Sequence, residues 1–241
     1  MKNLITTDKF FIAALSDTFE ALPHQHPIME IYAALDGIGH ISVGGELLEG
    51  QTIAIGPETM HAISDIGKKG LVIFIDVLST DAGFSLKDSI LRDNPFAVIN
   101  SVEIKEAVSV LRDDETEQAV HLAAESILRV LNTGSAVRPF SESVMNAICF
   151  ISQEKELFDM QTLASRIHLS KSRLAHVFSE ETGITLKSYL QFKRIESAFR
   201  QMVEGETITD AAYDAGFSSP SHIAASSRKL TGMQLKKLLN I

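Results

Sequence analysis

The chain has 241 residues, of which 45% are hydrophobic and 22% are charged, and this balance is typical of a soluble globular protein with one large domain or two ordinary ones. It has no run of about 20 apolar residues that would span a bilayer, and its first residues, Met1 to Leu4, lack the apolar run of a signal peptide. The net charge of −9 argues against non-specific binding of nucleic acid by the whole chain. We therefore expect a cytoplasmic protein without a membrane partner.

Charge divides the sequence into two unequal parts. Residues 1–138 carry 10 Lys and Arg against 20 Asp and Glu, whereas residues 139–241 carry 12 against 11. An acidic part joined to a nearly neutral one predicts two domains with different partners. The single cysteine, Cys149, lies in an apolar stretch and is expected to be a small buried hydrophobe.

Residues 6 to about 80 have the pattern of short strands separated by turns. The segments rich in Ile, Val and Ala are 28–35, 38–43, 52–55 and 71–77. The pair Gly44-Gly45 suits a two-residue hairpin loop, in which both residues take positive φ. Many short strands with close turns favour a barrel or a sandwich.

The periodicity becomes helical from about residue 101. One helix is predicted over 102–111 and a longer one over 115–131, from the spacing of their apolar residues. The stretch from Asn132 to Pro139 is rich in turn residues and predicts a linker. All of the chain after it has a helical pattern.

Two sequence motifs in the C-terminal part have the pattern of a helix-turn-helix. In the first, Ser170 is a predicted N-cap of a helix whose inner face holds Leu174, Val177 and Phe178. Gly183 is expected to end that helix in the left-handed conformation. The residues left on its outer side, where a recognition helix would meet DNA, include Lys171, Ser172, Arg173 and His176.

The second helix-turn-helix motif spans residues 208–232. Ser219 is expected to cap its second helix, and Pro220 occupies the first helical position, where its missing N–H costs nothing. The predicted outer side of this helix carries Ser221 and His222 early and Arg228 and Lys229 near its end. Between the two motifs, residues 186–203 form a predicted helix of roughly 27 Å. Such a helix would hold the two recognition helices near the spacing of about 34 Å between successive major-groove faces.

These motifs resemble the AraC-type (arabinose-regulator) family of bacterial transcription regulators. The resemblance covers about 142–233 and rests on 170–174, 180–183 and 208–219, with Tyr189, Arg194 and Ala198 between them. It implies a double helix-turn-helix domain that binds double-stranded DNA and activates or represses transcription. RNA polymerase is an expected further partner. The helix predicted over 115–131 has apolar positions spaced for packing against a second copy of itself, which would give a homodimer, or else against its own domain. The second helix-turn-helix motif departs from the family at Ile223, Ser227 and Leu235, where Phe, Phe and Pro are usual.

The N-terminal part resembles the cupin barrels. The run His24-Gln25-His26-Pro27-Ile28-Met29-Glu30, with His61 further on, matches their two motifs, although 57–61 lacks the usual glycine. In metal-binding cupins the residues that match His24, His26, Glu30 and His61 converge on one divalent metal, and three imidazoles with one carboxylate suit zinc, iron, manganese or nickel. The alternative interpretation is a hydrogen-bonded polar pocket for an organic effector.

The sequence thus predicts an α+β multidomain protein: a cupin-like β-barrel sensor domain over 1–100, a helical dimerisation or linker region over 101–138, and an all-α double helix-turn-helix domain over 139–241. We expect a transcription regulator that senses a small molecule or a metal and has no catalytic residues. The alternative is a metal-dependent cupin oxygenase or isomerase with a regulatory DNA-binding tail. A purely architectural DNA-binding protein is disfavoured, because it would leave the N-terminal half without a role.

Overall fold

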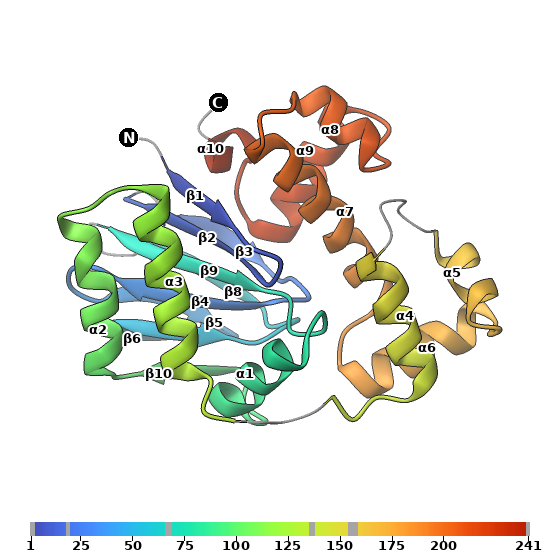
Figure 1. Ribbon diagram of the computed structural model, residues 1–241, viewed down its shortest axis with the longest axis horizontal. Helices are drawn as coiled ribbons and strands as arrows, with labels where there is room; N and C mark the ends of the chain where they lie inside the picture. The colour runs from blue at the N-terminus through green and yellow to red at the C-terminus, as the bar shows by residue number, and fades with distance from the viewer. Residues whose placement is uncertain (1–2, 18–19, 66–68, 135–137, 154–158, 240–241) are drawn as a thin grey trace. The chain divides into compact units, whose positions relative to one another are not determined.

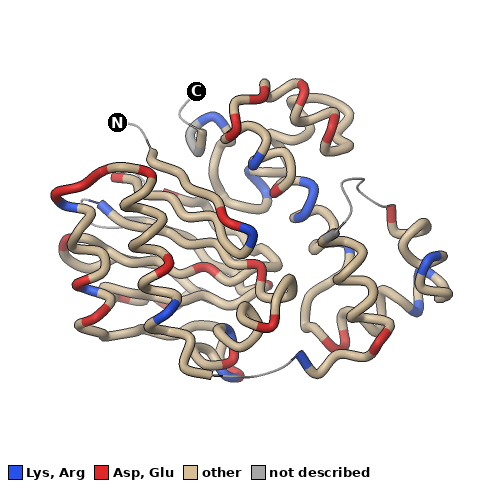
Figure 2. The backbone as a smooth tube through the Cα atoms, viewed as in Figure 1, with Lys and Arg blue, Asp and Glu red and all other residues tan. Residues whose placement is uncertain are grey.

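The computed structural model describes residues 3–17, 20–65, 69–134, 138–153 and 159–239. The chain separates into two compact units, one formed by residues 1–137 with 228–241 and the other by residues 138–227. We call them the first and the second unit. The helices of the described part include none that is both long and apolar enough to cross a membrane. Figure 2 shows how the charged residues are distributed along the backbone.

The first unit is built on two antiparallel sheets. The larger sheet has the strand order β1 (Leu4–Thr7), β2 (Phe11–Ser16), β9 (Gly70–Ile75), β4 (Met29–Ala34), β7 (Thr52–Ile55) and β10 (Phe96–Ile99). The smaller sheet has the order β3 (Ala21–His24), β8 (His61–Asp65), β5 (Gly39–Val43) and β6 (Glu46–Gly50). The four predicted strand segments correspond to β4, β5, β7 and β9. The predicted hairpin at Gly44-Gly45 joins β5 to β6, and the two glycines have φ of 58° and 94°.

Helices cover the outer face of the larger sheet. They are α1 (Asp81–Leu91), α2 (Val102–Ser109), the short 3-10 helix η1 (Val110–Arg112) and α3 (Glu117–Leu131). Figure 1 shows α2 and α3 side by side on the sheet, where α3 contacts β1, β2 and β9. Strand β4 is buried along its whole length: α2 contacts it, and its Glu30 reaches His61 of the smaller sheet. The prediction of strands followed by helices is confirmed, and closure of the strands into a barrel stays a prediction.

The second unit is all helical, as predicted. Its helices are α4 (Glu142–Gln153), α5 (Met160–Arg166), α6 (Lys171–Thr182), α7 (Leu186–Val203), α8 (Ile208–Asp214) and the beginning of α9 (Pro220–Thr231). The last residues of α9 and the short helix α10 (Leu235–Leu239) are grouped with the first unit. The core holds Leu174, Val177 and Phe178 of α6, and the Phe178 ring lies 5.7 Å from that of Tyr189 on α7.

Short polar side chains start the helices of the second unit. The Ser170 hydroxyl accepts a hydrogen bond from the Arg173 backbone N–H at 3.2 Å, and Gly183 ends α6 with φ of 71°. Thr185 and Thr207 cap α7 and α8 in the same way. Because each cap satisfies backbone donors that the helix itself leaves unpaired, these short helices have defined starting points.

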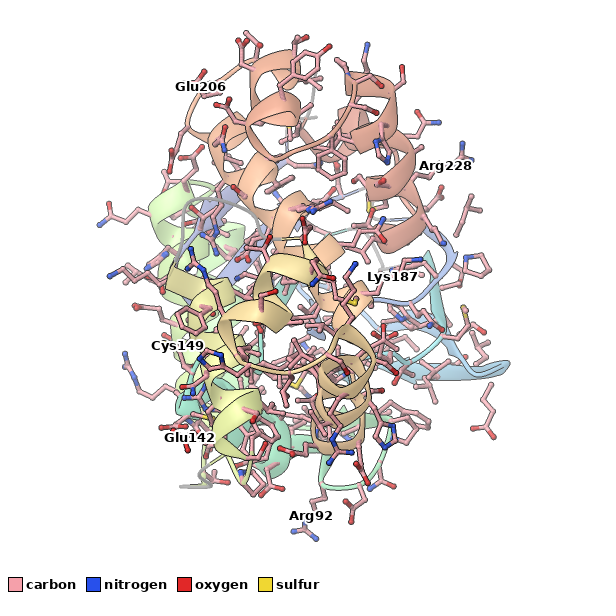
Figure 3. All side chains as sticks on the ribbon, turned by 90° about the vertical axis from the view of Figure 1, so that its right-hand side faces the viewer. Arg92, Glu142, Cys149, Lys187, Glu206 and Arg228 are labelled. Carbon is pink, nitrogen blue, oxygen red and sulfur yellow. The ribbon has the colours of Figure 1, made fainter. Side chains whose placement is uncertain are left out.

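Cys149 is exposed rather than buried, which corrects the expectation from its apolar neighbours (Figure 3). The reason is helical periodicity. On α4 the buried stripe consists of Val144, Ala147, Ile148 and Ile151, and Cys149 lies about 100° around the helix from Ile148. The predicted linker falls partly on residues 135–137, outside the described residues.

A buried ion-pair network lies on α7. The Glu196 carboxylate is 2.5 Å from Lys193 Nζ through one oxygen and 2.8 Å from Arg200 Nη2 through the other. Burial raises the pKa of Glu196, but the two cations outweigh this effect, so the pKa lies below its ordinary value. A carboxylate with a lowered pKa in the folded state stabilises the protein while it is ionised.

We expect Glu196→Gln to lower the free energy of unfolding at pH 7 by about 1.5–3 kcal/mol, the contribution of a hydrogen bond to a charged group. The wild-type advantage should be present above the pKa of an unfolded Glu, about 4.3, and should disappear as the pH falls through the lower folded pKa. Urea unfolding at pH 7 and pH 3.5 measures this difference. The control is Glu206→Gln at an exposed position between α7 and α8; equal losses in both variants would contradict the role given to Glu196.

Candidate functional site

Four predicted ligand residues come together in the first unit. His24 is the last residue of β3 and His61 is the first residue of β8, and the two are direct partners across that strand pair. His26 lies in the loop after β3, and Glu30 lies on β4 of the larger sheet. The cluster therefore joins side chains of both sheets.

The cluster is buried and compact. The four residues are between 1% and 4% exposed, and one potential ligand atom from each lies within 4.8 Å of all the others. Glu30 Oε2 is 3.0 Å from His26 Nε2 and 3.1 Å from His61 Nε2. The rings of His24 and His61 lie with centroids 4.2 Å apart.

Each imidazole is oriented by a backbone carbonyl two residues away. His24 Nδ1 donates to the Leu22 carbonyl at 2.8 Å, His26 Nδ1 to that of Ile28 at 3.0 Å, and His61 Nδ1 to that of Thr59 at 2.8 Å. A carbonyl only accepts, so Nδ1 carries the proton in all three rings. This arrangement directs every Nε2 toward the centre of the cluster, as in metal-binding histidines.

The charges in the cluster are coupled to one another. Burial raises the pKa of Glu30, but hydrogen bonds from His26 and His61 outweigh it and hold that pKa well below its usual range. Burial also tends to lower the pKa of His61, yet the bond to Glu30 raises it overall. For His24, burial and the nearby His61 lower the pKa to about 4. At neutral pH the site thus holds a carboxylate and a neutral His24 whose Nε2 lone pair is available.

The donor set fits a divalent transition metal. Imidazole nitrogens and carboxylate oxygens bind zinc at about 2.0–2.2 Å, so ligand atoms on opposite sides of one ion lie about 4 Å apart. The observed limit of 4.8 Å requires only small side-chain adjustments to reach that separation. Burial of an ionised carboxylate among three imidazoles also supplies the charge that compensates a cation.

The predicted DNA-reading residues of the first helix-turn-helix lie at the exposed start of α6. Lys171, Ser172, Arg173 and His176 are all exposed, and Ser170 is the N-cap of the helix. The left-handed turn at His168, with φ of 58°, separates α5 from α6. His176 is 3.6 Å from Glu180 one turn later, whereas Lys171 and Arg173 lie in the first turn of the helix.

The predicted residues of the second helix-turn-helix lie on α9. Ser219 Oγ accepts from the His222 backbone N–H at 3.1 Å, and the His222 ring contacts Ser218 Oγ at 3.1 Å. Ser221 and His222 are exposed at the start of the helix, and Lys229 is exposed near its end.

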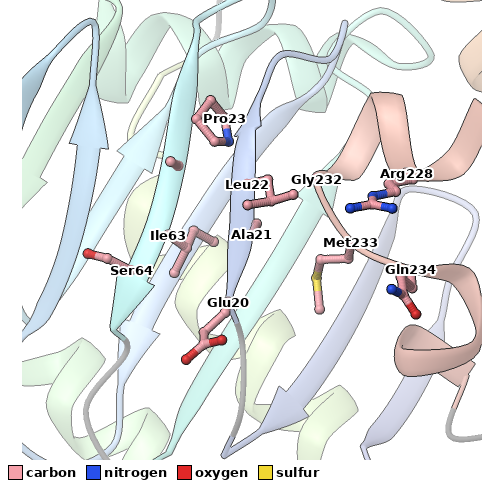
Figure 4. Close-up of a pocket in the computed structure, with 11 residues that line it drawn as sticks. Glu20, Ala21, Leu22, Pro23, Ile63, Ser64, Arg228, Gly232, Met233 and Gln234 are labelled. Carbon is pink, nitrogen blue, oxygen red and sulfur yellow. The ribbon is translucent and has the colours of Figure 1, made fainter.

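Arg228 is grouped with the first unit and lines a pocket of about 500 Å³ there (Figure 4). Residues 20–23 of the β3 region, residues 62–64 of β8 and residues 232–234 complete the lining. The sequence did not point to this pocket, because its two sides come from opposite ends of the chain. The carbonyls that orient the three imidazoles were also missed, since a backbone acceptor leaves no signal in the sequence.

Comparisons with known proteins support the identity of the C-terminal part. A family model described as a helix-turn-helix domain matches residues 163–240. Invasion protein InvF of Salmonella typhimurium is 31% identical over 102 residues, which cover 42% of this chain and 47% of that protein. The uncharacterized HTH-type transcriptional regulator YbfI of Bacillus subtilis is 31% identical over 125 residues, or 50% of this chain and 44% of that protein. The chain thus spans less than half the length of these curated relatives.

The fold is similar to that of ToxT from Vibrio cholerae along nearly the whole chain. The match has a TM-score of 0.61 at 15% identity and covers 97% of this chain and 98% of ToxT. A ToxT structure with a bound unsaturated fatty acid matches with a TM-score of 0.57 at 11% identity, over 97% and 96% of the two chains. The family model thus identifies a helix-turn-helix domain in residues 163–240, and the similarity to ToxT concerns the fold.

Proposed function

We propose that this chain is a sequence-specific DNA-binding regulator of transcription, acting in the cytoplasm on double-stranded DNA and RNA polymerase. The observation that carries this proposal is the exposed polar and basic start of α6 within a matched helix-turn-helix domain. The N-terminal end of a recognition helix is where side chains reach base edges in the major groove.

We assign the parts of the chain as follows. Residues 1–100 form the cupin-like sensor, residues 101–138 the helical dimerisation region and residues 139–241 the DNA-binding domain. A homodimer through the helical region accounts for the exposed apolar side chains Val102, Val110 and Leu122, which are 65%, 50% and 53% exposed. Large apolar side chains gathered on one region often mark a protein interface.

The first experiment separates phosphate contacts from base contacts. We expect Lys171→Gln or Arg173→Gln to weaken binding to all DNA sequences and to reduce the salt slope by about 1, because each would give up a phosphate contact. Substitution of Ser172 or His176 should instead change the sequence preference. Binding to operator and random DNA at two salt concentrations measures both effects.

Lys105→Gln is the matched control, since it removes the same charge from an exposed position on α2 of the first unit. It should leave the affinity and the salt slope unchanged. If all four substitutions on α6 behave like this control, α6 is not the helix that reads DNA.

The two predicted recognition helices, α6 and α9, should contribute unequally to sequence recognition. Strong readout usually relies on Arg or Lys at guanine and on Asn or Gln at adenine, each pair contributing about 1–3 kcal/mol. The start of α9 offers Ser221 and His222 instead, and its cations follow about two turns later. We therefore expect binding-site selection to yield one half-site of high information under α6, and two equally informative half-sites would contradict this assignment.

The sensor part is proposed to bind one divalent transition metal through His24, His26, Glu30 and His61. The alternative, an organic effector held by the same four side chains, is less compatible with their burial and with the short contacts between them. A bound metal would act as a Lewis acid and as a fixed positive charge in the cluster. A small-molecule effector would then bind elsewhere in the chain; one of the similar ToxT structures holds an unsaturated fatty acid.

Metal analysis tests this proposal. The purified protein, or the protein reconstituted with Zn²⁺, Fe²⁺, Mn²⁺ or Ni²⁺, should carry close to one ion per chain. His26→Ala should abolish binding, because it removes a ligand that Glu30 also uses as a hydrogen-bond partner. His40→Ala is the control, since His40 lies on β5 beside Glu49, 3.4 Å away and outside the cluster. Absence of metal after reconstitution would favour the organic effector.

The same cluster favours a second candidate, a metal-dependent cupin enzyme with a regulatory DNA-binding tail. A turnover screen of the metal-loaded protein against oxygenase and isomerase substrates distinguishes the two functions. We infer that the protein is a regulator rather than an enzyme, because a family model for a helix-turn-helix domain matches residues 163–240.

A further inference from the structure

The turn that follows α9 packs against β3 within the first unit. The Leu22 backbone N–H donates to the Gly232 carbonyl at 3.2 Å, and Gly232 and Met233 are buried. Figure 4 shows Leu22 on β3 facing this turn. The C-terminal turn, defined here as residues 232–234, therefore lies next to the strand that ends at His24.

One residue connects the C-terminal turn to the histidine cluster. Leu22 uses its N–H to bond Gly232 and its carbonyl to accept the His24 Nδ1 proton at 2.8 Å. The carbonyls of Ile28 and Thr59, which orient His26 and His61, have no such bond to the C-terminal turn among the described residues. His24 is thus the imidazole whose orientation is linked to the turn.

The contact is close enough to require glycine. A Cβ added at Gly232 would overlap the Leu22 carbonyl oxygen and would lie 2.7 Å from His24 Nδ1 and 2.9 Å from Leu22 N. Gly232 also has φ of 68°, a conformation that side-chain-bearing residues rarely adopt. Both the turn itself and its approach to β3 depend on the absence of a side chain at this position.

We propose that the C-terminal turn is a positioning element for His24, so that binding of a divalent transition metal and packing of the turn stabilise each other. This inference rests on the metal site proposed above. Its physical basis is that the turn fixes the peptide that holds His24 Nδ1 and shields that bond from water. Hydrogen-bond partners of metal-binding histidines typically change metal affinity 10–100-fold when they are altered.

The coupling would extend to the second predicted reading helix. α9 ends at Thr231, directly before the C-terminal turn, and it carries Ser221 and His222 at its other end. Because linkage is reciprocal, a metal that stabilises the packed turn is bound more tightly when the turn is packed. Metal occupancy would thereby influence how α9 is held.

The experiment compares two glycines with the same backbone conformation. Gly232→Ala should weaken Co²⁺ or Zn²⁺ binding by the full-length protein about 10–100-fold, measured by competition with a chromophoric chelator. Gly183→Ala is the control: Gly183 has φ of 71° and ends α6, but nothing lies within 4 Å of its added Cβ. It carries the same strain and should leave the metal affinity unchanged. The visible spectrum of bound Co²⁺ should shift in the Gly232 variant alone.

Hydrogen exchange in the wild-type protein provides a test that needs no variant of the turn. Metal should increase the protection of the Leu22 amide and of the amides in 232–234, whereas His26→Ala should show no increase. A wild-type protein that binds metal with neither this protection nor a loss of affinity in Gly232→Ala would overturn the inference and leave the metal proposal intact. A wild-type protein that binds no metal would overturn both.

Discussion

Glu30 is an ionised carboxylate placed between two sheets, and its charge has to be compensated there. Removing such a group from water costs several kcal/mol unless it is paired and hydrogen-bonded. His26 and His61 provide that compensation at 3.0 and 3.1 Å, and they come from the loop after β3 and from β8. The cluster thus ties the larger sheet to the smaller one. Whether protons or a metal supply the positive charge, the packing of both sheets depends on it.

The second unit is held together in a different way. Helices α5, α6, α7 and α8 begin at Asp, Ser or Thr caps, and α6 ends at Gly183 in the left-handed conformation. Local hydrogen bonds therefore define where these helices start. The apolar residues of α6 point into the core, so the first turn of this helix carries exposed polar and basic side chains. A DNA-reading surface needs this arrangement, because side chains that read bases must be held rigidly and yet stay exposed.

The sequence was most informative where structure is local. Periodicity predicted β4, β5, β7 and β9, and capping residues predicted α6 and α9, because these signals lie within a few neighbouring residues. The four residues of the histidine motif do lie together, with His24 and His61 paired across β3 and β8, His26 in the following loop and Glu30 on β4. Their role as metal ligands stays a prediction. The packing of Gly232 on Leu22 could not be predicted, because it joins positions 210 residues apart and involves only backbone atoms. Helix α1 and strand β10 were not predicted, because the apolar residues of these segments show no clear periodicity.

The unequal contribution that we expect from α6 and α9 to DNA binding bears on how a sensor domain would control the protein. A regulator whose heads both bound strongly would need a large coupling free energy to change its DNA affinity. Coupling between sites is typically 1–3 kcal/mol, which changes affinity about 5–150-fold. That is comparable to one or two good base contacts. A recognition helix that starts with Ser221 and His222 rather than with cations is expected to contribute on this scale. We therefore expect α9 to be the helix whose DNA binding responds to a modest change in the first unit.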